Sequence, residues 1–455
     1  MKTIRIGSGA GYGGDRIEPA LQLIKEGDLD YIIFECLAER TIALAQKEKI
    51  EDQNKGYNPL LEYRMEKLIP LLKNHKVRVI TNMGAANPIA AAEQVAEIAK
   101  KHELSELKIA AIVGDDILER ITEHYETPIL ETGETLATIK DKIISANAYI
   151  GAKEISKALA QGADIVITGR VADPSLTVGP LMYEFNQDYE NYDFLGKGTV
   201  MGHLLECAGQ VTGGYFVDPG FKDVPDLWNL GFPIAEFNEL GEITIEKLPN
   251  CGGAVTTATV KEQLLYEIQD PAKYYTPDVV ADFSHLRVSE ITKNKVQVLY
   301  GAGKEKTGTL KVSIGYEDGF IGEGEISYGG HNAYERAKLA GEVIQRRLEM
   351  QQVSFEEFRI DYIGINSLYK DSISNKFNNC GASEVRLRVA ARAENEENAK
   401  KIGREVEALY TNGPYGGGGA RAYVTKVVSV VSILVPELLV TTSIVWKGGI
   451  KVEAF

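Results

Sequence analysis

Five short apolar runs, each ending abruptly at polar or glycine residues, constrain the fold of this chain most. The clearest is ADIVITGRVADPS (163–175), in which a β-branched run ends at Gly169, Arg170 and Asp173. Four earlier runs end in the same way, before GSGAGYGGD (7–15), Glu35, NMGAANP (82–88) and GDD (114–116). Such runs are typical of parallel strands buried on both faces. Since ligands bind outside the carboxyl ends of these strands, the sequence predicts one crevice that binds a small polar molecule.

Helical segments separate these runs, so the first half of the chain alternates strand and helix. This alternation predicts a Rossmann-like open parallel sheet with helices on both faces, an α/β fold. From Phe283 the pattern changes to short strands of alternating polarity, joined by turns such as EDGF (317–320), and to two helices. This pattern favours a C-terminal α+β domain with a mainly antiparallel sheet. We therefore expect domains over 1–282 and 283–455.

Composition and charge narrow the class of partner. The formal net charge of −15 argues against a nucleic-acid partner, because phosphate binding needs a basic surface. The longest apolar tract (427–440) is interrupted by polar residues and is shorter than the ~20 residues of a spanning helix. The amino terminus has no long apolar signal segment. We expect a cytoplasmic protein with no membrane segment.

The cysteines are far apart in the sequence and show no C-x-x-C spacing. They are Cys36, Cys207, Cys251 and Cys380. This spacing favours reduced thiols in a reducing compartment over a disulfide framework.

The glycine-rich loop after the first strand contains a G-x-G-x-x-G pattern. In a dinucleotide-binding fold such a loop cradles the pyrophosphate, and an acid about 20 residues farther on binds the ribose. The next helix, however, begins only near Pro19, so the loop is longer than the usual tight turn. Glycines that let the backbone approach another anionic ligand are the alternative. The expected ligand contacts are Gly9, Gly11, Gly13, Gly14, Asp15 and Glu35.

Three further residues at strand ends are expected to contact the ligand. Asn82 and Gly84 follow the third strand, and Gly169 follows the fifth. Asn87 also fits the N-cap of a helix over 90–100, which is a structural role of equal weight.

Adjacent carboxylates follow the fourth strand, at Asp115 and Asp116. Paired acids can hold a divalent cation, but they are also common in the first turn of a helix. We favour the helix interpretation because no histidine lies at ligand spacing, and we assign no residue to a metal.

A helix over 197–207 carries His203, Glu206 and Cys207 at positions i, i+3 and i+4, and therefore on one face. A histidine beside a carboxylate and a thiol forms a general base with its orienter, or a base with a nucleophile. The structural alternative is a small core thiol and a histidine satisfied by its neighbours.

Two glycine-rich segments farther along are also candidates. Cys251, Gly252 and Gly253 can form a turn that stabilises an oxyanion, or an ordinary hairpin or bulge. The segment PYGGGGARA (414–422) can form a backbone anion nest, a tight packing point or a flexible loop. From this segment we expect Gly416, Gly417 and Arg421 to contact the ligand.

Several long motifs occur in an order that resembles the acyclic terpene utilisation AtuA family. They are ITGRVADPSL (167–176), GHLLECAGQVTGGYFVDPG (202–220), NCGGAVTTATVKEQLLYEIQDP (250–271) and TNGPYGGGGARA (411–422). The resemblance covers essentially the whole chain. It implies a role in the breakdown of citronellol- and geraniol-type terpenoids through acyl-CoA or branched carboxylic intermediates. It implies no established reaction and no assigned catalytic residues.

We therefore expect an enzyme that acts on a small carboxylate or acyl-CoA-type substrate by lyase or hydratase chemistry. Arg170 would clamp the carboxylate, and Asp173 or the His203–Glu206 pair would move protons. One alternative is a nucleotide-dependent oxidoreductase that uses the Gly9–Gly14 loop. Another is a non-catalytic subunit that completes a site with a small partner protein. The sequence identifies no cofactor, and we expect a symmetric homo-oligomer.

Overall fold

A computed structural model describes residues 2–374, 376 and 382–449 of the chain. The chain divides into two compact units. Unit 1 comprises Met1–Gly315 and Val430–Phe455, and unit 2 comprises Tyr316–Ser429. The predicted boundary between residues 282 and 283 differs from this division. The first hairpin after residue 283 belongs to the large sheet of unit 1, and the chain returns to unit 1 at Val430.

The described part of unit 1 is built around a mixed sheet of ten strands. In spatial order these are β11 (Arg287–Thr292), β12 (Lys295–Leu299), β8 (Ile243–Lys247), β7 (Pro233–Asn238), β1 (Thr3–Ala10), β2 (Tyr31–Phe34), β3 (Arg78–Thr81), β6 (Ile165–Thr168), β4 (Lys108–Val113) and β18 (Ser443–Gly448). The consecutive strands β1, β2, β3, β6 and β4 are parallel. The five apolar runs of the sequence are these strands.

The rest of this sheet corrects the prediction of an open parallel sheet. Strand β7 pairs antiparallel with β1, β8 with β7, β12 with β8, and β18 with β4. Short connections such as residues 239–242 join neighbouring strands here, and only antiparallel neighbours can be joined so tightly. The parallel order β1-β2-β3-β6-β4 also differs from the 3-2-1-4-5-6 order of dinucleotide-binding sheets.

Helices cover both faces of the parallel strands. From β1 to β4 the chain steps in one direction across the sheet, and from β4 to β6 it steps back. Right-handed crossovers therefore place helices on opposite faces before and after β4. On one face lie α1 (Glu18–Glu26), α3 (Leu61–Leu72) and α4 (Pro88–Lys101), and on the other α5 (Lys153–Ala160), α6 (Ser175–Glu184) and α7 (Tyr192–Glu206). Strand β2 shows the alternation, since Ile32 and Phe34 pack with the first group and Tyr31 and Ile33 with the second.

The remaining elements of unit 1 flank this core. Helix α7 contacts a small sheet of strands β13 (Ala302–Lys304), β10 (Val280–Asp282) and β9 (Tyr274–Tyr275). The other elements are α2 (Glu39–Glu51), β5 (Ile143–Ala148), α8 (Thr257–Leu265), and the 3₁₀ helices η1 (Leu118–His124), η2 (Leu136–Lys142), η3 (Ala208–Gln210), η4 (Leu227–Asn229) and η5 (Glu437–Leu439).

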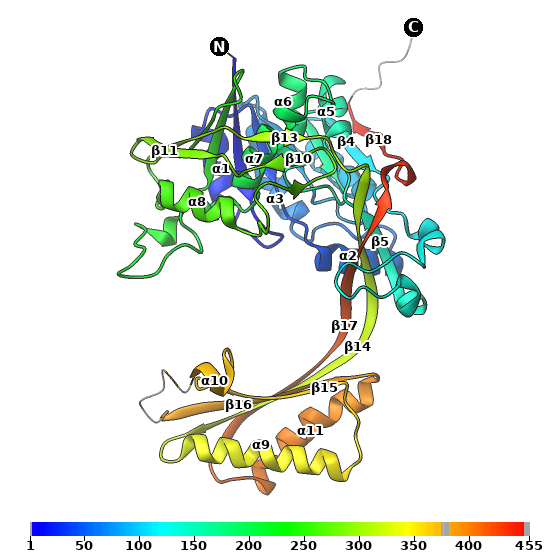
Figure 1. Cartoon of the computed structure of the whole chain (residues 1–455), viewed down its shortest axis with the longest axis vertical. Helices are drawn as coiled ribbons and strands as arrows, with labels where there is room; N and C mark the ends of the chain where they lie inside the picture. Colours follow the sequence, from blue (N-terminus) through cyan, green and yellow to red (C-terminus); the bar gives the residue numbers. More distant parts are fainter. Residues whose placement is uncertain (1, 375, 377–381, 450–455) are drawn as a thin grey trace. The chain divides into compact units, whose positions relative to one another are not determined.

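Unit 2 is an antiparallel sheet with two long helices on one face (Figure 1). The strands are, in spatial order, β15 (Glu357–Ile363), β16 (Glu384–Ala393), β14 (Thr309–Gly329) and β17 (Gly417–Pro436), and the helices are α9 (Ala333–Met350), α10 (Lys370–Ser374) and α11 (Glu396–Asn412). Alternate residues of β16, such as Leu387 and Val389, pack against Ile344 of α9 and Ile402 of α11. This part of the chain is α+β, as predicted.

Two predicted loops are strand in the structure. The segment EDGF (317–320) lies inside β14 rather than at a turn, and from Phe320 onward β14 pairs with β16. The side chain of Asp318 accepts hydrogen bonds from Arg392 and Ser429. In the segment 414–422, residues from Gly417 onward belong to β17.

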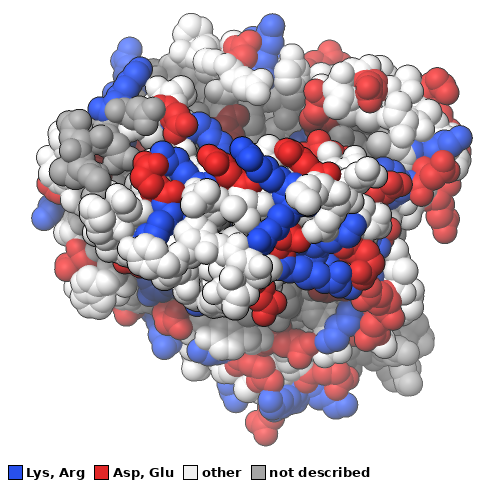
Figure 2. Space-filling view, turned by 90° about the horizontal axis from the view of Figure 1, so that it is seen from below, with Lys and Arg blue, Asp and Glu red and all other residues white. Residues whose placement is uncertain are grey.

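Charged side chains of opposite sign are interleaved on the face drawn in Figure 2. Helical pairs such as Lys338–Glu335 and Lys400–Glu396 follow this pattern in unit 2. No helix in the described part of the chain is long and apolar enough to cross a membrane.

Candidate functional site

Polar side chains from distant parts of the sequence meet at the carboxyl ends of the parallel strands. Glu35 follows β2, Asn82 follows β3 and Asp115 follows β4, while Arg170 and Asp173 follow β6. The first four are at least nine-tenths buried, and the side chain of Asp173 is 35% exposed. The structure thus brings four predicted site residues, Glu35, Asn82, Arg170 and Asp173, into one cluster in unit 1. Asp115, for which the sequence favoured a role at a helix start, joins them.

The guanidinium of Arg170 occupies the centre of the cluster and is 1% exposed. Its Nη1 donates a hydrogen bond to the carbonyl of Leu37 at 2.5 Å. Its Nε and Nη2 donate to the carbonyl of Val171 at 3.0 and 2.5 Å, and Nη2 also donates to Asp173. The ring of Tyr149 packs against the guanidinium, with its centroid 4.4 Å from Cζ. Arg170 is therefore a fixed, buried cation that positions Asp173, whereas the sequence predicted a clamp for a substrate carboxylate.

Asp115 fixes the backbone next to this cation. Its Oδ2 accepts hydrogen bonds from the backbone N–H of Arg170 at 2.9 Å and from Nδ2 of Asn147 at 3.0 Å. Burial raises the pKa of Asp115 to about 6, against the lowering effect of these donors. A Cβ at Gly169 would lie 2.5 Å from Oδ1 of Asp115, so the glycine permits the close approach of this carboxylate. Asp116 instead accepts from the N–H of Leu118 at the start of η1, in line with the helix interpretation.

Glu35 and Asn82 are engaged with each other and with the backbone. Oε1 of Glu35 accepts from Nδ2 of Asn82 and from the N–H of Leu37, both at 2.9 Å. Oδ1 of Asn82 accepts from the N–H of Cys36 at 2.7 Å. Burial, together with the negative charge of Asp173, raises the pKa of Glu35 well above its usual value. This pair links the ends of β2 and β3 within the cluster.

Tyr149 also contacts a second charged group, formed by Glu39 and Lys311. Its hydroxyl donates to Oε1 of Glu39 at 2.5 Å, and Nζ of Lys311 donates to the same oxygen at 3.0 Å. Although burial opposes ionisation, these two donors lower the pKa of Glu39 to about 2. Tyr149 therefore contacts both groups, with its ring centroid 4.4 Å from Cζ of Arg170 and 5.1 Å from Nζ of Lys311.

A cavity of about 690 Å³ opens beside these groups within unit 1. Its volume lies in the range of ligand pockets. Burial, with the charges of Glu206 and Glu39, raises the pKa of Asp173 to about 6 despite the opposing charge of Arg170. Apart from three threonines, Thr276, Thr307 and Thr309, the wall combines charged groups with apolar and aromatic ones. It includes Glu39, Tyr149, Asp173, Glu267, Lys311, Leu130, Ala172, Pro174, Tyr274, Tyr275, Pro277 and Leu434.

His203 is held between two acceptors on α7 and α8. Its Nδ1 lies 2.7 Å from Oε1 of Glu206, and its Nε2 lies 2.9 Å from the carbonyl oxygen of Gln263. Burial favours the neutral imidazole, but Glu206 and the Gln263 carbonyl outweigh this effect and raise the pKa of His203. Both ring nitrogens then donate, so the ring has no free lone pair for a general base. Oε2 of Glu206 is buried and has no hydrogen-bond partner among the described residues.

Comparison of the chain with known proteins gives one match, to a protein family. The family described as acyclic terpene utilisation family protein AtuA matches residues 4–446, which is nearly the whole chain. The chain belongs to the AtuA family. No curated protein and no solved structure matches this AtuA-family chain. Among residues 2–374, 376 and 382–449, no group of three or more His, Cys, Asp or Glu side chains is arranged to hold a metal ion.

Cys207 of this AtuA-family chain is a weak candidate for a nucleophile. It caps the C-terminus of α7, and burial together with the charge of Glu206 raises the pKa of its thiol. Cys36, Cys207 and Cys251 are free thiols, whereas Cys380 lies outside the described residues.

The glycines of the first loop pack closely against other parts of the chain and do not border open space. A Cβ at Gly11 would lie 2.4 Å from the carbonyl carbon of Cys207, and one at Gly9 would lie 2.6 Å from the ring of Phe34. The equivalent atoms at Gly13 and Gly14 would meet the Cys36 carbonyl at 3.0 Å and the Tyr12 ring at 2.9 Å. Asp15 accepts from the N–H of Gly11 at 2.9 Å, and α1 starts only at Glu18. These contacts account for the loop without a nucleotide.

The turn at Cys251 does not present free donors. The N–H of Gly252 donates to the carbonyl of Asn229 at 2.9 Å, and that of Gly253 donates to the carbonyl of Pro225 at 2.8 Å. Because both N–H groups are bonded within the chain, the predicted oxyanion-stabilising role is unsupported. The bridge between Gly252 and Leu230 is parallel, so the segment is not a hairpin either.

Other predicted contacts have structural surroundings. A Cβ at Gly84 would lie 2.5 Å from the carbonyl oxygen of Thr168, so this glycine allows β3 and β6 to pack closely. Asn87 caps α4 by accepting from the N–H of Ala90 at 3.3 Å. Gly416, Gly417 and Arg421 belong to unit 2, in a different unit from the Arg170 cluster, and Arg421 is exposed.

Of the cavity wall, the sequence predicted only Asp173 as a site residue. The residues that it missed include Glu39, Tyr149, Lys311 and Tyr274. Glu39 was detectable, because it lies just beyond the end of β2, like the predicted Glu35. Lys311 and Tyr274 lie on strands far from the parallel ends in sequence, and no local pattern distinguishes them from ordinary surface residues.

Proposed function

We propose that this AtuA-family chain is a cytoplasmic catabolic enzyme that uses Asp173 as an acid–base group on a small acyl substrate. The observation that carries the proposal is the position of Asp173, which lines the cavity and accepts a hydrogen bond from the buried guanidinium of Arg170. A carboxyl with a pKa near 6 exchanges protons readily at neutral pH, which is what general acid–base catalysis requires.

The wall of the cavity supports a substrate with an apolar body and a polar head. Leu130, Pro277 and Leu434 offer aliphatic surface, which suits a branched hydrocarbon chain. Lys311 is the cationic side chain of the wall and would contact the carboxylate or thioester carbonyl. The family description, acyclic terpene utilisation, agrees with such a chain.

Lyase or hydratase chemistry fits these groups best. In a dehydration, the Asp173 carboxylate would take the proton from the carbon next to the carbonyl. The carbon–oxygen bond at the neighbouring carbon would then break, and the departing hydroxyl would take the proton that Asp173 has accepted and leave as water, which returns Asp173 to its carboxylate form. Burial and nearby carboxylates raise the pKa of Tyr274, so its hydroxyl stays protonated and can donate a hydrogen bond to the departing oxygen. The free Oε2 of Glu206 is a further acceptor near these groups.

The test is turnover of a panel of branched 3-hydroxy and 2-unsaturated acids and their CoA thioesters, followed by mass spectrometry for the gain or loss of water. We expect Asp173→Asn to lower kcat/KM by about 100-fold or more on the substrate that reacts. Asp188→Asn, at an exposed position outside the cavity, is the matched control. Full activity of a folded Asp173→Asn protein would refute the proposal.

Separate measurements test the two alternative functions, a nucleotide-dependent oxidoreductase and a non-catalytic subunit. A nucleotide present at 100 times its Kd would add about 2.7 kcal/mol of stability and raise Tm. Because the first-loop glycines are packed against the chain, we expect no rise with NAD, NADP or ATP. Turnover by the purified chain alone would exclude a subunit that depends on a small partner protein.

A further inference from the structure

The surface of unit 1 carries an apolar pocket that the proposed function does not use. The pocket has a volume of about 570 Å³ and lies between residues 216–223 and α8. Its apolar contributors include Phe221, which is 87% exposed, and Leu265, which is 70% exposed. Tyr215 and Trp228, from the same stretch of chain, are 88% and 79% exposed. Large apolar side chains gathered in this way mark an interaction surface.

Phe221 is exposed on a turn that is held closed by hydrogen bonds. The N–H of Phe221 donates to the carbonyl of Asp218 at 2.9 Å, and the backbone groups of Asp218 and Lys222 bond each other in both directions. The N–H of Gly220 donates to Oδ1 of Asp223 at 3.0 Å. The turn is therefore preorganised, so binding through Phe221 would cost little ordering entropy.

One face of helix α8 forms the wall of the pocket opposite residues 216–223. Ala258, Lys261, Glu262 and Leu265 are exposed and line the pocket. The buried positions are Thr259, Val260, Gln263 and Leu264, which face the core of unit 1. The outer face thus combines apolar surface with charge at a spacing of three and four residues.

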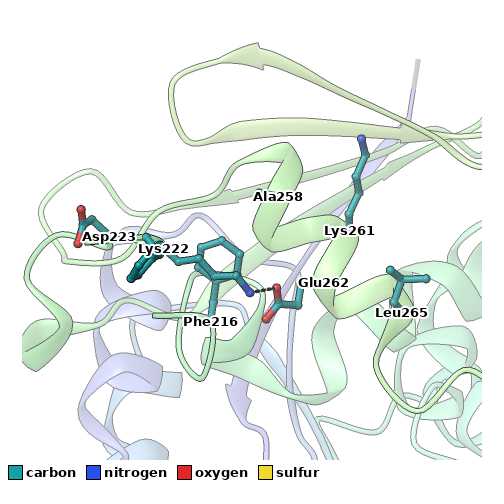
Figure 3. A pocket seen from close by; sticks show the side chains of 8 residues that line it. Phe216, Lys222, Asp223, Ala258, Lys261, Glu262 and Leu265 are labelled. Atoms are coloured by element: carbon teal, nitrogen blue, oxygen red, sulfur yellow. Dashed lines mark hydrogen bonds and ion pairs between the residues drawn. The ribbon is translucent and has the colours of Figure 1, made fainter. Parts of the chain in front are cut away.

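The charges of the pocket are arranged with opposite signs at its two ends. Figure 3 shows Asp223 at one end and Lys261 at the other, with Phe216, Lys222 and Glu262 between them. Lys222 pairs with Glu262 at 2.6 Å and lies over the ring of Phe216 at 4.7 Å. Neither Asp223 nor Lys261 has an ion-pair partner within the described part of the chain.

We propose that this pocket is an isologous interface with a second copy of the same chain. A two-fold axis through the middle of the pocket would bring Asp223 of each copy opposite Lys261 of the other. The same axis would bring the two Phe221 side chains, now in water, into the facing apolar surface. A C2 interface requires such a self-complementary patch. The proposal does not depend on the proposed function.

A small molecule fits this surface less well. Ligand sites bury most of the ligand surface, whereas the apolar side chains here extend outward into solvent at the rim. An interface with an apolar centre and charged ends is typical of protein association.

The interface would also touch the candidate site through α8. Gln263, on the inner face of the helix, bonds His203 in both directions, at 2.9 and 3.0 Å. Glu267, just beyond the helix, lines the cavity beside Asp173. Association would therefore hold α8 in place against the His203–Glu206 pair.

The first experiment is sedimentation analysis of the full chain over a range of concentrations. We expect a dimer, and Phe221→Ala is expected to weaken it by about 30-fold, as for a central apolar anchor. Leu240→Ala, exposed at a turn outside the pocket, should leave the dimer unchanged. Circular dichroism melting confirms folding, which the exposed positions should not affect. A wild-type monomer, or a dimer indifferent to Phe221→Ala, would overturn the proposal.

The second experiment tests the two-fold pairing by charge reversal. Asp223→Lys or Lys261→Glu alone places like charges opposite each other at both ends, and each should weaken the dimer by about tenfold. A mixture of the two single variants, carrying different tags, restores both opposite-charge pairs and should form mixed dimers with affinity within about threefold of wild type. Lys140→Glu, at an exposed position outside the pocket, is the charge control. Mixed dimers no tighter than the weakened homodimers would overturn the assignment of this surface.

Discussion

Nδ1 of His203 lies 2.7 Å from Oε1 of Glu206, and both side chains are more than nine-tenths buried. The second ring nitrogen faces the carbonyl of Gln263, so the imidazole acts as a double donor. This places His203 among the residues that position other groups and leaves Glu206 with one free oxygen.

The His203–Glu206 pair predicts a pH dependence of stability. The pKa of His203 is raised in the folded state, so its contribution is full below the unfolded value of 6.5 and is lost as pH rises through the folded value. His203→Gln removes this titration and leaves Glu206 buried without a cation, which should cost about 3 kcal/mol. Urea unfolding at several pH values measures both effects. His285→Gln, at an exposed site, is the control, and equal pH slopes in His203→Gln and wild type would contradict the prediction.

Asp115 also predicts a loss of stability as pH rises, in this case because burial favours its neutral form. Its folded pKa of about 6 exceeds the usual 3.8, so the folded state holds the proton more tightly and loses stability as pH rises between these values. The loss amounts to about 3 kcal/mol at neutral pH. Asp115→Asn keeps an acceptor oxygen but no titration, so it should gain stability relative to wild type from pH 4 to 7. Chemical unfolding across that range is the measurement. Asp141→Asn, which is exposed, should run parallel to wild type, and the same course for Asp115→Asn would disprove the assignment.

Gly11 predicts a steric effect in the first loop. A Cβ there would lie 2.4 Å from the backbone of Cys207, which has little freedom to move. Gly11→Ala should therefore destabilise the chain by about 1–3 kcal/mol. Gly418→Ala is the matched substitution, because nothing lies within 4 Å of its Cβ position, and it should change stability by less than about 1 kcal/mol. Thermal melting compares the two, and tolerance of Gly11→Ala would show that the loop is open.

Asp361 predicts a strong effect in unit 2. Its side chain is 2% exposed and accepts from Nε of Arg359 at 2.8 Å, from Nη1 of Arg388 at 3.0 Å, and from Lys370. Asp361→Ala leaves these cations without their shared carboxylate, but the cations are partly exposed to water, so the loss should be about 1–3 kcal/mol. Asp371→Ala, on α10, removes a less buried carboxylate and serves as the control. Chemical unfolding measures the loss of stability, and hydrogen exchange of the amides in β15 and β16 shows whether it falls on these strands. Equal stabilities of Asp361→Ala and Asp371→Ala would contradict the prediction.

The strand ends were predictable because their signals are local. The runs that end at Glu35, Asn82, Asp115 and Arg170 are continuous apolar segments, and such segments form parallel strands whichever residues lie elsewhere. The antiparallel pairing of β7 and β18 with this sheet was not predictable, because partners far apart in sequence decide it. For the same reason the insertion of unit 2 between Gly315 and Val430 was missed.

The sequence predicted several residues of the candidate site but not the role of each one. The sequence pointed to Arg170, Asp173 and His203 as chemical residues. It could not show that carbonyls of Leu37, Val171 and Gln263 occupy the donors of Arg170 and His203. Nor could it bring Lys311 to the cavity, since that residue arrives on β14.

The sequence by itself determined the order of parallel strands and helices in the first half and the α+β character of the insert, because hydrophobic periodicity acts over a few residues. Only the tertiary structure decided which polar atoms remain free. Asp173 and Oε2 of Glu206 stay available because other donors and acceptors are satisfied by backbone groups from distant segments. Hydrogen bonding is short-ranged in space and indifferent to distance along the chain, so this choice is made when the segments pack.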